Sequence, residues 1–140
     1  MERAQKVEWL RRFRLLDSEI QACRDELCFW RERAGCMVER YGEKTGRGGA
    51  PLDVGDVAVK IMDLEAELNR RMEELISCRQ AIQGAIEEIE DARLRHVLVL
   101  RYIEGLTVED AADRMFYSWR QAQRLHGQAL DRLVVPEGVD

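Results

Sequence analysis

The side chains between residues 118 and 128 are of the types that hydrogen-bond to DNA base edges and phosphates. Most of them fall on one side of a helical pattern, and an apolar stripe with steps of three and four falls on the other. The first residues of a recognition helix are those that reach base edges. A solvated helix that only packs would show the same periodicity. The candidate DNA-binding residues are Ser118, Trp119, Arg120, Gln121, Gln123, Arg124 and Gln128. The apolar stripe consists of Ala122, Leu125, Ala129, Leu130 and Leu133.

Two helix-start signals position this pattern. Thr107 has Asp110 three residues later, and Ser118 has Gln121 three residues later. Each hydroxyl can therefore accept a hydrogen bond from an N–H group of the first helical turn. Eleven positions separate the two starts, which leaves room for two turns of helix and a tight turn. The sequence thus predicts a helix-turn-helix whose last helix covers residues 119–133.

A further helix is expected just before this pair, over residues 92–104. Asp91 is a candidate cap at its start, and Gly105 is a typical stop because glycine adopts the left-handed conformation without steric cost. The predicted DNA-binding module is therefore residues 91–133, followed by a short tail at residues 134–140.

The first 90 residues are expected to form a long antiparallel helical hairpin. Residues 1–41 and 57–90 both carry apolar side chains at heptad-like spacing, as in a coiled-coil seam. The connection, residues 42–56, is rich in glycine, and Asp56 is a candidate cap for the second helix. Helices joined in this way fold back on each other. The predicted fold class is therefore all-α. The seam of the first helix is Leu10, Phe13, Leu16, Ile20, Cys23, Leu27, Trp30, Ala34 and Met37.

Two features of the hairpin bear on its assembly. Its apolar stripes are broader than one partner helix covers, so self-association, most simply as a dimer, is expected. Gly84 lies in the middle of the second helix, where it marks either a close helix contact or a bend.

Charge is distributed unevenly along the chain. The sequence has a formal net charge of −5, with 35% charged and 46% hydrophobic residues. Residues 42–90 carry a net charge of −5, whereas residues 91–133 carry only +1. A DNA-binding module that is only slightly basic predicts weak binding by a monomer, which a dimer or a bound polymerase would strengthen.

The sequence offers little for catalysis or metal binding. The cysteines form no CxxC pair, so free thiols are expected. His96 and His126 are too far apart in sequence to indicate a dyad, and residues 42–56 lack the spacing of a phosphate-binding loop. We therefore expect no enzyme, no metal and no cofactor. No signal peptide or membrane span is visible, so a cytoplasmic protein is expected. The cysteines are Cys23, Cys28, Cys36 and Cys78.

The C-terminal segment resembles the fourth region of the main bacterial sigma factor family, which reads the upstream promoter element. The matching residues are Leu100, Arg101, Tyr102, Gly105, Thr107, Glu109, Ala112, Ser118, Ala129, Leu130 and Leu133. With MDLEAE at residues 62–67 and LHGQAL at residues 125–130, the whole chain is similar to small phage and prophage proteins. These combine a helical N-terminal half with a sigma-like C-terminus and are regarded as late transcription regulators.

This resemblance implies base contacts by Trp119, Arg120, Gln123 and Arg124, and RNA polymerase as a candidate partner. Phe116 stands where the turn usually has a glycine. A bulky side chain opposes the left-handed conformation, so the geometry of this turn is not predicted. Trp119 is expected either to contact DNA or to cover the turn beside Phe116.

The favoured function is a sequence-specific, DNA-binding transcription regulator that reads a promoter or operator. A phage terminase small subunit, which also joins a helix-turn-helix to an oligomerising helical part, is the first alternative. A helical interaction protein that does not bind DNA is the second.

Overall fold

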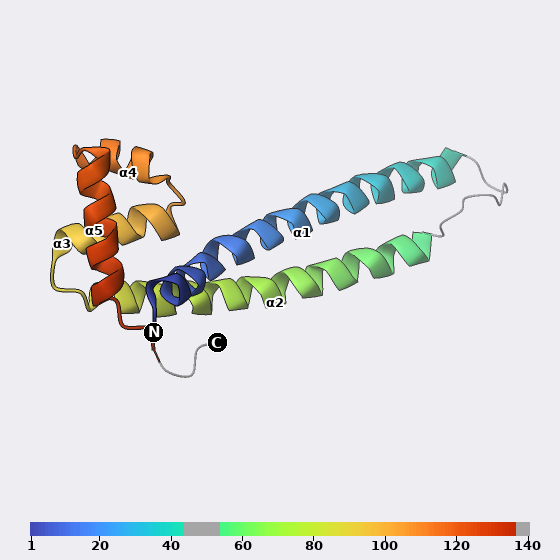
Figure 1. The fold of residues 1–140 in the computed structure, drawn as a ribbon. Helices are drawn as coiled ribbons and strands as arrows, with labels where there is room; N and C mark the ends of the chain where they lie inside the picture. The colour runs from blue at the N-terminus through green and yellow to red at the C-terminus, as the bar shows by residue number, and fades with distance from the viewer. Residues whose placement is uncertain (44–53, 137–140) are drawn as a thin grey trace. The chain divides into compact units, whose positions relative to one another are not determined.

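The computed structural model describes residues 1–43 and 54–136, with only the backbone of residues 37–43 (Figure 1). This described part of the chain is helical and contains no strand, which confirms the all-α fold class. The elements are α1 (Arg3–Glu43), α2 (Val54–Glu87), α3 (Ala92–Leu98), the π-helix η1 (Val99–Ile103), α4 (Val108–Met115) and α5 (Trp119–Arg132). No helix within the described ranges is long and apolar enough to cross a membrane.

Two compact units make up the chain. Unit 1 combines residues 1–17 with residues 74–140, and unit 2 is residues 18–73. These units do not divide after residue 90, where the sequence pattern changes. The reason is that the start of α1 and the end of α2 share one apolar core with α3 and α5.

The core of unit 1 is built from five segments distant in sequence. Leu10 from α1, Ile86 from α2 and Leu98 from α3 are at most 2% exposed, and Leu133 closes the core after α5. Burying apolar side chains of this size stabilises a fold by about 1.5–3 kcal/mol each. The three C-terminal helices are therefore held by the first and last turns of the two long helices as well as by each other. The cluster consists of Trp9, Leu10, Phe13, Ile82, Ala85, Ile86, Ile89, Leu94, Val97, Leu98, Tyr102, Leu125, Ala129, Leu130 and Leu133.

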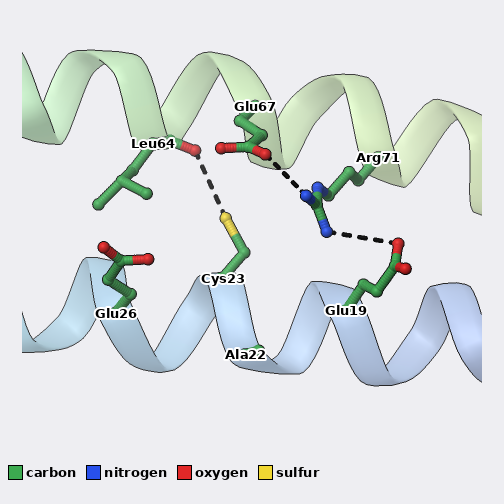
Figure 2. Close-up of a pocket in the computed structure, with 7 residues that line it drawn as sticks. All are labelled: Glu19, Ala22, Cys23, Glu26, Leu64, Glu67 and Arg71. Atoms are coloured by element: carbon green, nitrogen blue, oxygen red, sulfur yellow. Dashed lines mark hydrogen bonds and ion pairs between the residues drawn. The ribbon is translucent and has the colours of Figure 1, made fainter.

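Unit 2 is a pair of helices, the middle of α1 beside the first half of α2. Among its described residues few are buried: Ile20, Cys23, Leu27, Val57 and Leu64, of which Cys23, Leu27 and Leu64 form one cluster. Figure 2 shows a hollow between the two helices, where Arg71 bonds to Glu67 at 2.7 Å and to Glu19 at 3.4 Å. The expected seam is buried at Ile20, Cys23 and Leu27, whereas Trp30 and Ala34 are half-buried and the Met37 side chain lies outside the described residues.

Most of the expected helix caps are confirmed. Thr107 Oγ1 accepts a hydrogen bond from the Asp110 N–H at 3.1 Å, and Asp91 Oδ1 accepts one from the Arg93 N–H at 2.9 Å. The expected cap Asp56 is wrong, because α2 begins at Val54 and Asp56 lies inside its first turn. A carboxylate there still favours the positive end of the helix.

The helix expected over residues 92–104 changes its hydrogen bonding halfway. It is α-helical to Leu98 and π-helical from Val99 to Ile103, where the Glu104 N–H donates to the Val99 carbonyl at 3.0 Å. No glycine or proline marks the change, and tertiary packing of Leu100 and Tyr102 accompanies it. The sequence pattern therefore predicted the extent of the helix but not its π-helical end.

Two other expectations fall largely outside the described residues. Of the connection expected at 42–56, the flanks are helical, and residues 44–53 are not described. Of the tail, residues 134–136 are described and are not helical.

Glycines in unit 1 are required at one position and not at another. Gly105 has φ of 75°, and a Cβ built there would lie 2.6 Å from the Arg14 guanidinium carbon. Gly84, inside α2, would place a Cβ with no atom within 4 Å, so it does not mark a close helix contact.

Substituting alanine at these two glycines should therefore change stability in opposite directions. Gly105→Ala should lower the free energy of unfolding by about 1–2 kcal/mol, the cost of a left-handed alanine. Gly84→Ala should raise it by up to about 1 kcal/mol, the difference in helix propensity. Urea unfolding of both variants measures this, and equal effects of the same sign would contradict the geometry.

Candidate functional site

Helix α5 separates an apolar face from a polar one. Its first turn is capped by Ser118, whose Oγ accepts from the Gln121 N–H at 3.1 Å. The apolar stripe expected from the sequence is confirmed, because Ala122 and Ala129 are fully buried and Leu125, Leu130 and Leu133 are at most 4% exposed. Burial of this stripe fixes which way the helix faces.

The candidate DNA-binding residues lie together on the first two and a half turns of α5 and its cap. Six of them are exposed: Ser118, Trp119, Arg120, Gln123, Arg124 and Gln128. Gln121 is half-buried, which leaves it less of its side chain for contacts outside the chain. The structure thus brings a continuous polar face to the surface, with Arg120 and Arg124 one turn apart.

The arginines of residues 91–133 fall into two groups. Arg93 and Arg114 pair with Asp91 and Glu104 at 3.1 and 3.5 Å, and Arg95 and Arg101 donate to backbone carbonyls. The three arginines of α5, by contrast, form no ion pair with any other described residue. Five of the seven arginines of residues 91–133 therefore form no ion pair within the described chain, and three of these five are on α5. These three are Arg120, Arg124 and Arg132.

The start of α1 contacts the last turns of α5, which the sequence did not predict. Arg3 bonds to both carboxylate oxygens of Asp131, at 2.6 and 2.5 Å, and Lys6 Nζ donates to the Leu130 carbonyl at 2.8 Å. Gly127 makes room, since a Cβ there would lie 3.0 Å from Arg3 Nη1. Hydrogen bonding and charge from Arg3 hold the pKa of Asp131 below its usual value. The arginines in the N-terminal half of the face, Arg120 and Arg124, form no such ion pair with the described residues of α1.

His126 is a packing residue of this helix. Its Nε2 lies 2.7 Å from the Tyr102 hydroxyl, and the two rings stack with centroids 5.7 Å apart. Burial, with smaller effects from Arg101 and other cations, lowers the pKa of His126 to about 4. The imidazole is therefore neutral near pH 7, and its Nε2 shares a hydrogen bond with the Tyr102 hydroxyl. His96 is exposed on α3 and does not take part.

The turn before α5 adopts the conformation that a bulky residue opposes. Phe116 has φ of 60° and ψ of 38°, which is the left-handed region. The Tyr117 N–H donates to the Ala112 carbonyl at 2.9 Å, and the Phe116 N–H donates to the Asp113 carbonyl at 3.2 Å. This is the bonding pattern that usually ends a helix with glycine. Phe116 is 94% exposed, so Trp119, itself 52% exposed, does not cover it.

Other groups that might do chemistry are engaged in packing or pairing. Within the described ranges no three His, Cys, Asp or Glu residues are placed to hold a metal ion. Cys23 is buried, as its place in the seam predicted, Cys78 is half-buried, and all four cysteines are free thiols, as expected. In the hollow of unit 2, Arg71 neutralises Glu19 and Glu67, and Lys60 lies 3.8 Å from Glu26.

Comparison with known proteins gives one family. The model described as "Protein of unknown function (DUF1492)" matches residues 38–133, and the chain belongs to this family. No curated protein and no solved structure matches the chain.

Neutral His126 makes the stability of unit 1 depend on pH. Its pKa rises from about 4 to its ordinary value of 6.5 on unfolding, so the unfolded state takes up a proton first as the pH falls. The contribution of neutral His126 to the free energy of unfolding is complete above pH 6.5 and is lost as the pH approaches 4. For a partly solvated group we expect a loss of about 1–2 kcal/mol.

His126→Gln keeps an acceptor for Tyr102 but does not titrate in this range. Urea unfolding of both proteins between pH 7 and pH 4 should therefore give a shallower decline for the variant. Parallel pH profiles would show that His126 is not buried and neutral.

Proposed function

We propose that this member of the DUF1492 family is a sequence-specific DNA-binding protein that regulates transcription, with the first half of α5 in the major groove. The observation that supports this most is the exposed face around Arg120, Gln123 and Arg124 on a helix whose other face is fully buried. Arginine and glutamine are the side chains that pair with guanine and adenine edges. In this proposal α4 and α5 act as a helix-turn-helix of the sigma-region type.

The distribution of ion pairs in residues 91–133 also supports DNA binding by α5. An excess of only one basic group over residues 91–133 is a weak electrostatic footprint for the module as a whole. Within this segment Arg93 and Arg114 form ion pairs with Asp91 and Glu104, whereas the three arginines of α5 form none with any described residue. An anionic partner would therefore meet Arg120 and Arg124 first. The exposed carboxylates of α4, Glu109, Asp110 and Asp113, keep binding by one copy weak.

A dimer would supply the missing affinity. Unit 2 buries only five apolar side chains among its described residues, while Phe29, Val59 and Met62 are 54–67% exposed. A second copy covering such residues would place two α5 helices on one duplex, and each would read a half-site. RNA polymerase is the other partner that we propose. A ring-sized oligomer would instead favour the DNA-packaging alternative.

Replacing Arg120 and Arg124, which form no ion pair within the described chain, should abolish sequence-specific DNA binding. For Arg120→Ala combined with Arg124→Ala, we expect affinity for a selected target to fall by at least about thirtyfold, since each base contact contributes about 1–3 kcal/mol. Arg33→Ala combined with Arg70→Ala is the matched control, because both side chains are exposed in unit 2 and the change in net charge is the same.

Fluorescence anisotropy at fixed salt measures the DNA affinity of both double variants, and circular dichroism checks that each variant remains folded. Equal losses for the two pairs would mean that binding follows net charge alone. Unchanged affinity of the α5 variant would rule out this helix as the reader.

A further inference from the structure

Phe116 is strained and exposed at the same time. It is the one residue other than glycine with a positive φ in the described part of the chain. Left-handed backbone is unfavourable for a bulky side chain, and residues strained in this way cluster at active sites, ligand clamps and switch regions. With 94% of the residue exposed, no packing within the described chain offsets the strain.

The fold itself does not need this ring. Both hydrogen bonds of the turn, from the N–H groups of Phe116 and Tyr117, come from the backbone. Glycine would make the same bonds without strain and without exposing an aromatic ring to water. The side chain therefore weakens the free protein on both counts, which points to a contact made only in a complex.

Its position indicates what it contacts. Phe116 lies two residues before the cap Ser118, and the half-exposed Trp119 and the free cation Arg120 follow directly. Because the positive charge of Arg120 lies this close to Phe116, the partner that fits best is the polyanionic DNA duplex. The apolar feature of the major groove is the thymine C5-methyl group, which phenylalanine contacts in protein–DNA complexes.

We infer that Phe116 is a specificity-determining residue that packs on a thymine methyl at the edge of the site read by α5. This inference rests on the proposed function, because it requires α5 to lie in the major groove. The strain in the turn then serves to direct the ring away from the core and toward the duplex.

Phe116→Gly separates this role from folding. The melting temperature should stay unchanged or rise by a few degrees, because glycine relieves the strain. Affinity for a target selected from random DNA should fall about tenfold, because an aromatic side chain that contacts the DNA is lost. Loss of affinity without loss of stability is a result that a purely structural residue would not give.

Uracil in place of thymine tests the methyl contact directly. Removing the methyl should weaken wild-type binding about three- to fivefold, and should have little effect on Phe116→Gly. Trp119→Ala is the matched control, and it should keep the sensitivity to uracil if Phe116 makes the contact.

Each other outcome is informative. If the wild type binds a selected target and Phe116→Gly binds it equally well, or is equally sensitive to uracil, the inference is overturned and the proposed function stands. If Phe116→Gly changes the mass measured by light scattering, the ring is a contact between subunits and the inference is overturned. If the wild type binds no DNA, the proposed function is overturned, and the inference is overturned with it.

Discussion

Burial of one face of α5 is the constraint on which the rest of the structure depends. Ala122 and Ala129 have no exposed surface, and α5 packs closely against α3 and α4. Leu10 at the start of α1 and Ile86 at the end of α2 complete the same core. Because the apolar face is fixed in this way, the residues between its positions must face outward. The polar face of α5 is therefore as well determined as the core.

The same packing decides which part of that polar face is accessible. Arg3 reaches across Gly127 to Asp131, so the start of α1 occupies the last turns of α5. The carboxylate of Asp131 is neutralised there, and it no longer opposes an anionic partner. The N-terminal half, with Arg120 and Arg124, has no such pairing within the described chain and lies next to a capped helix end whose N–H groups also favour anions. The positive charge of Arg120 and Arg124, unpaired within the described residues, therefore lies on an exposed part of α5.

Local chemistry explains how much of this was predictable. Thr107 and Ser118 cap the helices that follow them because a hydroxyl at the right spacing is sufficient, and no distant contact can easily override it. The pairing of Arg3 with Asp131 joins residues 128 positions apart, and no local pattern encodes it. The left-handed turn at Phe116 contradicts the residue's own preference. There the backbone hydrogen bonds of the turn outweigh the side chain, which is why sequence reasoning failed at that position.

Selection of bound sites from random double-stranded DNA by the purified full-length chain is the most direct test that α5 reads DNA sequence. We predict enrichment of a single motif, with two half-sites about one helical turn apart if the protein acts as a dimer. A retained pool as diverse as the starting one would contradict sequence-specific reading. No retention even at low salt, where phosphate contacts are strongest, would contradict DNA binding altogether and favour a helical interaction protein.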